Sequence, residues 1–190
     1  ATQISVGYHH ACAVLQDGNI KCWGEGGFGI LGAGNQTDRA VKPTAQTAVD
    51  LGTGRTAQKV SLGIYHTCAL LDNGDVKCWG RNNYGQSGQE NNSPIGDAGS
   101  EMGDDLPAID LGTGKSAIDI EAMYESTCAI INDGDVKCWG RNNFGQLGQG
   151  TTTTIGDGVG EMGDVLVSVD LGPGRTATKL YGGLYQMLSL

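Results

Sequence analysis

Hydrophobic and polar residues alternate in short runs at regular intervals along the chain. Two apolar residues enclose one polar residue in each run, as in Ile4 and Val6, Val60 and Leu62, and Ile118 and Ile120. Successive side chains of a strand point to opposite faces, so this period of two predicts short β-strands that bury one face. The chain also contains 33 glycines and shows no 3.6-residue helical period, which leaves little room for helix.

A second pattern follows each run and contains two cysteines with nine residues between them. The copies read HACAVLQDGNIKCWG, HTCALLDNGDVKCWG and STCAIINDGDVKCWG, at 10–24, 66–80 and 126–140. The spacing is too long for a zinc site, whose paired cysteines usually have about two to four residues between them. A three-residue loop at 72–74 instead places Cys68 opposite Cys78 in a hairpin, with Gly74 in the left-handed position. A two-residue loop would place Cys68 opposite Trp79.

The repeated hairpin predicts local disulfide bridges. The expected pairs are Cys12–Cys22, Cys68–Cys78 and Cys128–Cys138. Each bridge closes a short loop and is expected to contribute about 2–3 kcal/mol to stability. Because disulfides persist in oxidising compartments, we expect a secreted, extracellular protein. Reduced cysteine pairs in a cytosolic protein are the alternative.

The hairpin belongs to a longer repeat that begins at Ala1, Ala57, Ala117 and Ala177. Each unit contains an alternating run, the hairpin, a glycine-rich stretch, a long loop and a segment such as VDLGTGRTA. A unit of this length with about four short strands is typical of a β-propeller blade. The sequence therefore predicts an all-β fold of three complete four-stranded blades and the first part of a fourth. The expected boundaries are 1–56, 57–116, 117–176 and 177–190.

Charge and composition narrow the classes of partner. The net charge is −9 and there is no basic cluster, which disfavours binding to nucleic acid or to anionic membranes. No apolar run is long enough to cross a bilayer. Asn35 opens an Asn-Gln-Thr sequon, which makes it a candidate glycosylation site. We expect a protein partner, for which a second copy of the chain is one candidate, and no cofactor.

No group of residues predicts catalysis. The three histidines are His9, His10 and His66, and no nucleophile, base and orienting acid can be assembled around them, so we expect no enzyme. Two acidic loops repeat an Asp, Glu, Asp order that could supply oxygen ligands to calcium, although the spacing matches no calcium loop. The calcium candidates are Asp97, Glu101, Asp104, Asp157, Glu161 and Asp164. Solvated loops or subunit contacts are the favoured alternative, with no metal.

The repeats resemble a known family. GIYHTCALLDNGDVKCWGRNNYGQSG and CWGRNNFGQLGQG are similar to the repeats of the regulator of chromosome condensation family, whose members form seven-bladed propellers. The cysteine pairs and GEMGDVLVSVDLGPGRTA are most similar to a secreted branch. Gly26 and Ile30 in the first repeat, and Met123 and Ser126 in the third, depart from the pattern. Members include an exchange factor, a photoreceptor and secreted inhibitors, so the resemblance implies a rigid ring that presents loops and leaves the function open.

We expect a partner to bind the residues just before each hairpin. These positions vary in size and charge between repeats more than core positions would: Tyr8 and His9, Ile64 and Tyr65, Tyr124 and Glu125, Leu184 and Tyr185. Aromatic side chains are good anchors in protein interfaces. The binding candidates are Tyr8, His9, Tyr65, Tyr124 and Glu125. Ordinary contact between blades is the alternative.

The expected function is a secreted, non-enzymatic scaffold for protein interaction or extracellular structure. Three blades do not close a ring, since propellers usually have about four to eight. The blades are therefore expected to continue in a longer chain, or to self-assemble end to end into a homo-oligomeric ring or filament. A secreted inhibitor or receptor-like binding domain that uses loops on one ring face is the alternative.

Overall fold

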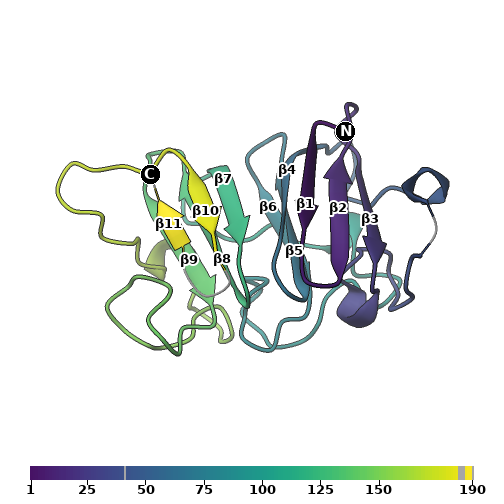
Figure 1. The fold of residues 1–190 in the computed structure, drawn as a ribbon. Helices are drawn as coiled ribbons and strands as arrows, with labels where there is room; N and C mark the ends of the chain where they lie inside the picture. The colour runs from purple at the N-terminus through teal and green to yellow at the C-terminus, as the bar shows by residue number, and fades with distance from the viewer. Residues whose placement is uncertain (41, 184–186, 190) are drawn as a thin grey trace.

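The computed structural model describes residues 1–40, 42–183 and 187–189 and arranges them as sheets in an arc (Figure 1). Three sheets of three antiparallel strands follow one another, and a two-stranded sheet comes last. The strands are β1 (Gln3–Val6), β2 (His10–Val14), β3 (Ile20–Gly24), β4 (Ala57–Leu62), β5 (His66–Leu71), β6 (Val76–Gly80), β7 (Ala117–Ala122), β8 (Ser126–Ile131), β9 (Val136–Gly140), β10 (Leu180–Gly182) and β11 (Met187–Ser189). Each sheet is a meander in sequence order, as in a propeller blade.

Helix is confined to short 3-10 turns in the loops. These are η1 (Gly27–Gly29), η2 (Pro43–Ala45), η3 (Gly103–Asp105) and η4 (Gly163–Val165). Within the described ranges, no helix has the length and apolar character needed to cross a membrane. The predicted all-β fold is therefore confirmed. The first strands of the second and third repeats begin at Ala57 and Ala117, whereas β1 begins at Gln3 and β10 at Leu180.

The cysteine hairpins have the predicted register. Cys68 lies directly opposite Cys78, and the backbone N–H of Leu71 donates to the carbonyl of Asp75 at 2.9 Å, which closes a three-residue loop. Gly74 in that loop has φ +84°, a conformation that favours glycine. Disulfides join Cys12 to Cys22, Cys68 to Cys78 and Cys128 to Cys138, each with the two Cα atoms 4.1 Å apart.

The outer position of each blade is an irregular segment rather than a full fourth strand. The N–H of Ile109 donates to the carbonyl of Val76 on β6 at 2.8 Å, and the first and third blades repeat this bond. Shortly afterwards Gly112, with φ +111°, turns the chain away from the sheet. The outer segment therefore pairs with β6 over only a few residues before the turn at Gly112.

The innermost strands of neighbouring blades lie side by side. Figure 1 shows β1, β4, β7 and β10 along the inside of the arc. The side-chain amide of Gln3 on β1 both donates to the carbonyl and accepts from the N–H of Val60 on β4, each at 2.8 Å. On the next strands, the ammonium of Lys59 lies 2.8 Å from Asp119 and 3.2 Å from Glu121. Side chains thus connect inner strands whose backbones are not paired.

Hydrophobic cores lie between consecutive blades. One face of each blade carries the tryptophan and the opposite face carries the disulfide, so that Trp79 and Val60 pack against the first blade's Cys12–Cys22 bridge. Trp79 and Trp139 are both fully buried. The disulfide sulfurs are therefore buried under the neighbouring blade.

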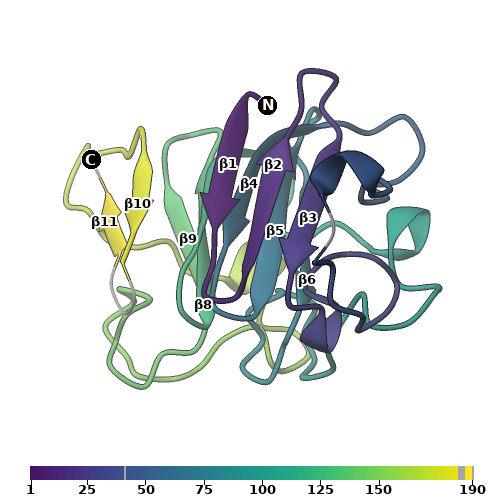
Figure 2. The same cartoon turned by 45° about the vertical axis from the view of Figure 1, so that its right-hand side comes forward.

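One face of the first blade is not covered by any described sheet. Ile4 and Val6 are 62% and 72% exposed, whereas the equivalent Val60 and Leu62 are 0% and 7% exposed. In Figure 2 the sheet formed by β1, β2 and β3 faces the viewer with no other sheet in front of it. Trp23, on the same face, is half-buried. This face has the apolar character of a blade-contact surface.

The alternating run in the third repeat lies two residues later than the sequence predicts. Ile120 and Ala122 are buried, whereas Ile118 is 54% exposed. The pairing of β7 with β8 shifts register between Ala117 and Asp119. This irregularity turns Ile118 away from the core, so its assignment to the buried face is wrong.

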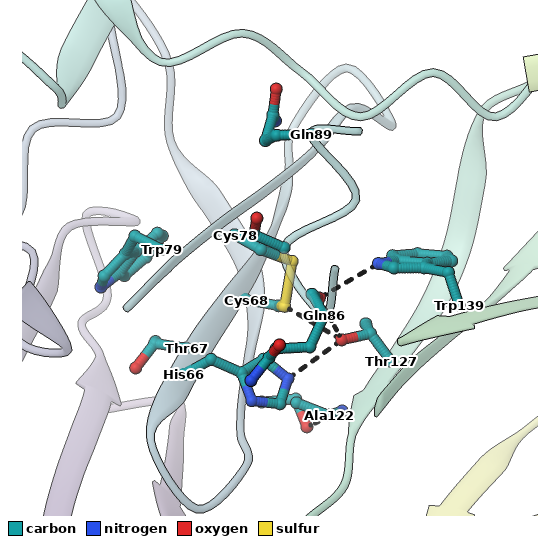
Figure 3. Close-up of a disulfide and its surroundings, with 12 residues drawn as sticks. His66, Thr67, Cys68, Cys78, Trp79, Gln86, Gln89, Ala122, Thr127 and Trp139 are labelled. Atoms are coloured by element: carbon teal, nitrogen blue, oxygen red, sulfur yellow. Dashed lines mark hydrogen bonds between the residues drawn. A yellow bond between two sulfur atoms is a disulfide. The ribbon is translucent and has the colours of Figure 1, made fainter. Parts of the chain in front are cut away.

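A cluster of hydrogen bonds joins each blade to the next, and we call it the inter-blade cluster. Figure 3 shows the copy formed by His66, Gln86, Thr127 and Trp139. The hydroxyl of Thr127 donates to the carbonyl of Gln86 at 2.9 Å, and Trp139 Nε1 donates to the same carbonyl at 3.1 Å. His66 Nε2 lies 3.0 Å from the Thr127 hydroxyl, and the Cys68 sulfur is 3.8 Å from it. Four polar groups are thus satisfied in a contact that is buried between two blades.

The same cluster joins the first blade to the second. His10 Nε2 lies 2.9 Å from the hydroxyl of Thr67, which donates to the carbonyl of Ile30. Trp79 Nε1 donates to that carbonyl at 3.0 Å. The repeated cluster therefore assigns His10 a structural role.

The sequence departures in the third repeat have a steric explanation. A Cβ atom on Gly63 would collide with the imidazole of His66 and with the carbonyl oxygen of Met123, so this position requires glycine. The third repeat has Ser126 in place of the histidine and Met123 in place of the glycine, and Met123 is 3% exposed. The smaller serine leaves room that the methionine side chain can occupy.

Candidate protein-interaction surface

The predicted binding residues lie in equivalent turns at one end of the blades. Tyr8 and His9 occupy the β1–β2 turn and are exposed. Tyr65 precedes β5 and is half-buried, as is Tyr124 before β8. Glu125 is only 6% exposed. The structure thus places these residues on one face, and Glu125 beneath its surface.

Backbone hydrogen bonds bring a second residue beside each turn. The N–H of Arg81 donates to the carbonyl of Tyr65 at 2.7 Å, and the N–H of Arg141 donates to the carbonyl of Glu125 at 2.9 Å. Both arginines directly follow a Trp-Gly pair, where the first blade has Glu25. The local chain path therefore directs an arginine toward the turn in two of the blades.

Aromatic rings from the first two blades meet around one of these arginines. The ring centroid of His9 is 4.3 Å from that of Tyr8 and 6.3 Å from that of Tyr65. Phe28, from η1, lies 5.8 Å from Tyr65. The Arg81 guanidinium carbon lies 5.6 Å from the Phe28 centroid and 5.8 Å from the Tyr65 centroid. These distances are typical of cation–π contacts.

Glu125 connects this group to the third blade. Its carboxylate lies 3.3 Å from Arg81 and 2.7 Å from Arg141, and the hydrogen bond from Arg141 raises the pKa of that guanidinium. Arg141 in turn lies 5.0 Å from the ring centroid of Tyr84. We call the whole set the arginine–aromatic row: Tyr8, His9, Phe28, Tyr65, Arg81, Glu125, Arg141 and Tyr84.

The row presents apolar rings and ordered cations to solvent. Tyr8 is 64% and Phe28 is 38% exposed, and the side chains of Arg81 and Arg141 are 25% and 22% exposed. A buried carboxylate holds both arginines in place, so little side-chain entropy is lost when a partner binds them. Such a surface can stack on planar groups and donate hydrogen bonds to carboxylates or carbonyls.

Tyr124 borders the row, and its electrostatic interaction with Arg141 helps to raise the pKa of that guanidinium. It lines a hollow with Tyr8, Ile64 and Met123 where the inner strands end. Its backbone carbonyl accepts the N–H of Ile64 at 3.1 Å. Leu184 and Tyr185, the equivalent pair of the last repeat, lie outside the described residues.

Sequence reasoning missed Arg81, Arg141, Phe28 and Tyr84. The available signal was the repeated Arg-Asn-Asn-aromatic segment after Trp-Gly, which reads RNNY and RNNF in the second and third repeats. In the sequence these segments are identified only as glycine-rich stretches that follow the hairpins. The proximity of Phe28 to Arg81 joins two different repeats, so no local pattern contains it.

The acidic loops use their carboxylates to hold their own backbone. One oxygen of Glu101 accepts the N–H groups of Gly96, Asp97 and Ala98 at 2.9–3.1 Å. Glu161 repeats this arrangement in the third blade with two N–H groups. Burial raises the pKa of Asp97, which fits poorly with a calcium ligand.

The remaining calcium candidates connect blade segments. Asp104 accepts the N–H and the hydroxyl of Thr53 at 2.8 and 2.6 Å, and Asp164 binds Thr113 in the same way. These hydrogen bonds lower the pKa values of both carboxyls. Burial also raises the pKa of Asp157. Across the described ranges, no group of three or more His, Cys, Asp or Glu side chains has the geometry of a metal site, so the calcium alternative has no geometric support.

The predicted glycosylation residue is accessible. Asn35 is exposed in the loop after η1. Its side-chain oxygen accepts the N–H of Thr37 at 3.0 Å, and its amide donates to the carbonyl of Ala33 at 3.1 Å. The loop therefore presents the sequon at the surface.

Comparison with known proteins identifies the repeat. The model for the regulator of chromosome condensation (RCC1) repeat matches residues 1–30, 57–86 and 119–146, and a second model of that name matches residues 17–70. The ultraviolet-B receptor UVR8 of Arabidopsis thaliana is 37% identical over 154 residues, covering 78% of this chain and 31% of the receptor. The mouse RCC1 domain-containing protein 1 is 26% identical over 182 residues, with coverages of 80% and 47%.

Solved structures agree on the fold. The crystal structure of Kap60 bound to yeast RCC1 (Prp20) matches with a TM-score of 0.69 and 16% identity, covering 99% of this chain and 41% of the other. Human WBSCR16 matches with a TM-score of 0.65 and 18% identity, with coverages of 94% and 43%. The chain thus spans less than half the length of each of these relatives.

Proposed function

The chain belongs to the regulator of chromosome condensation (RCC1) repeat family, and from that membership we propose that it is a non-enzymatic propeller segment that binds a protein partner through the arginine–aromatic row. The observation that carries this proposal is the buried Glu125 carboxylate, which orders Arg81 and Arg141 beside exposed aromatic rings. Arginine and tyrosine are enriched among the residues that dominate binding energy in protein interfaces.

Three further observations support a protein partner and a location outside the cytosol. The crystal structure of yeast RCC1 with Kap60 provides a protein complex of the same fold. The disulfides are buried between blades and suit an oxidising compartment. A net charge of −9 disfavours nucleic acid as the ligand. A secreted inhibitor or receptor-like domain is the specific role that fits this face.

Replacing Arg81 tests the proposal. A photo-crosslinking amino acid at Tyr8 first identifies the partner by mass spectrometry, and calorimetry then measures its affinity. Arg81→Ala is expected to weaken binding by about tenfold or more, since truncating a central interface arginine typically costs about 1.4 kcal/mol or more.

Arg55→Ala is the matched control. Arg55 forms a 3.3 Å ion pair with Asp72 at the hairpin loop, outside the row. Its replacement is expected to leave the affinity unchanged. Equal affinities of the Arg81→Ala variant and the unmodified protein, with the fold intact, would exclude the row as the binding surface.

The exposed face of the first blade favours end-to-end self-association as a second function. Ile4 and Val6 are apolar and exposed where the other blades have buried contacts. Either further blades of the same protein or a second copy can cover this face, and copies that meet head to tail form a ring or a filament.

Light scattering distinguishes these arrangements for the 190-residue chain. Self-association predicts a particle mass above 19.7 kDa that falls to the monomer value when Ile4 and Val6 are both replaced by serine. A monomer before and after substitution would rule out self-association through this face.

A further inference from the structure

A carboxylate of the second blade is bound by the backbone of the third. One oxygen of Glu90 accepts the N–H groups of Gly160, Glu161 and Met162, at 2.9, 2.8 and 2.9 Å. Glu90 has φ +55°, a conformation uncommon for residues other than glycine. Three successive N–H groups that converge on one oxygen form an anion-binding nest.

The contact between the first and second blades is built in the same way. Gly29 lies against Gly96, as Gly85 lies against Gly156, so closely that a Cβ atom on either Gly29 or Gly85 would collide with the facing backbone. Both contacts also place a methionine beside the buried tryptophan, with Met102 near Gly32. The loop at 96–102 of the second blade therefore lies against the first blade in the same way as the loop at 156–162 of the third blade lies against the second.

The first blade lacks the carboxylate. The repeat places Gly34 where the second blade has Glu90, and Gly34 has a similar φ of +65°. A Cβ atom on Gly34 would lie 3.2 Å from the Cα of Gly99, directly against the loop. Among the described residues, no group accepts a hydrogen bond from the N–H groups of Ser100, Glu101 or Met102. In the repeat, these three N–H groups are equivalent to those of Gly160, Glu161 and Met162, which bind Glu90.

We propose that Ser100, Glu101 and Met102 form an open nest that binds a carboxylate group of a protein partner, in the place where Glu90 fills the equivalent nest. The assignment to a protein partner rests on the proposed function. Phe28 of the arginine–aromatic row immediately precedes Gly29, which contacts the start of this loop at Gly96. One partner can therefore reach both features.

The negative charges around the open nest favour a carboxylate that is held in place by other contacts over a free anion. Asp97 and Glu101 are negative neighbours of the open nest, as Asp157 and Glu161 are of the filled one. Glu90 binds despite these charges because its own chain holds it in place. A carboxylate anchored by other interface contacts has the same advantage of high effective concentration over a free anion.

Amide NMR with reciprocal substitutions tests the nest without a known partner. Sodium acetate, compared with sodium chloride at equal ionic strength and pH 7, is expected to shift the amide signals of Ser100–Met102 saturably and to leave those of Gly160–Met162 unchanged. Gly34→Glu is expected to abolish the shifts and to raise the midpoint of thermal unfolding. Glu90→Gly, which suits the positive φ, is expected to open the second nest and produce acetate shifts there.

The outcomes separate this inference from the proposed function. Absence of shifts at Ser100–Met102 overturns the nest, whether or not Glu90→Gly produces shifts, and leaves the arginine–aromatic row untouched. Shifts that persist in Gly34→Glu overturn it as well. A blocked Gly-Glu-Gly peptide is expected to reproduce the acetate shifts and a Gly-Gln-Gly peptide to produce none. Binding of acetate without binding of the glutamyl peptide overturns the assignment to a protein partner.

Discussion

Lowering the pH from 7 to 5 is expected to reduce the free energy of unfolding by about 4 kcal/mol, mostly through two buried histidines. Burial lowers the pKa of His10 to about 4 and that of His66 to about 3. Both imidazoles belong to inter-blade clusters and are 3% and 0% exposed. Urea denaturation at both pH values measures the effect.

The direction of the effect follows from which state binds the proton. In the unfolded chain both histidines have pKa values near the ordinary histidine value of 6.5, so they become charged as the pH falls below it. The folded protein keeps them neutral until the pH reaches the lowered values. Stability is therefore complete above about pH 6.5 and is lost by about 1.4 kcal/mol per pH unit for each histidine below it.

The geometry supports neutral rings in the folded state. The hydroxyl of Thr127 donates to the carbonyl of Gln86, so it accepts from Nε2 of His66. Nδ1 of His66 is buried and has no hydrogen-bond partner in the described part of the chain. A proton added there would lack an acceptor.

Replacing one histidine isolates its contribution. His66→Gln is expected to remove about 2 kcal/mol of the pH effect, half of the total, because one of the two buried imidazoles is gone. Burial raises the pKa values of Asp97 and Asp157, so their protonation partly offsets the loss at the acidic end. An unchanged pH dependence in His66→Gln would show that other groups cause the acid sensitivity.

Replacing Trp139 by alanine is expected to lower the free energy of unfolding by about 3–5 kcal/mol, the usual cost of truncating a buried tryptophan. Trp139 is fully buried between the second and third blades, and its Nε1 donates to the carbonyl of Gln86 at 3.1 Å. The substitution removes that bond and leaves a cavity. Trp139→Phe, a milder change, is expected to retain the fold at a smaller cost.

Trp23→Ala is the matched control. Trp23 occupies the same repeat position but is half-buried, because no described blade covers its face. Its replacement is expected to cost roughly 1 kcal/mol. Equal costs at Trp23 and Trp139 would contradict the open face and indicate that another blade or a second copy covers the first blade.

The hairpins could be predicted from the sequence because all their determinants are local. The position of Gly74 and the spacing of Cys68 and Cys78 set the loop length, and loop length sets strand register. Fifteen neighbouring residues contain this information, and the structure repeats it in each cysteine hairpin. The repeat made the blade architecture predictable for the same reason, since each copy is one supersecondary unit.

The contacts between blades were decided by the tertiary structure. Phe28, Tyr65 and Arg81 meet only because adjacent sheets pack face to face and their loops follow one path, and neither condition is contained in a short segment. The same holds for the acidic loops. Their sequence is compatible both with calcium binding and with hydrogen bonds from a carboxylate to its own backbone. Only the positions of the N–H groups around Glu101 distinguish the two.

The sequence by itself determined the all-β repeat, the hairpin register and the cysteine pairing, because hydrogen bonds and covalent geometry between near neighbours specify them. Only the tertiary structure decided which side chains face the next blade. The shifted register at Ile118, the binding of Glu90 by another blade and the gap left by Gly34 all depend on how one sheet is positioned against the next. That position results from many weak contacts between distant residues, which no local pattern records.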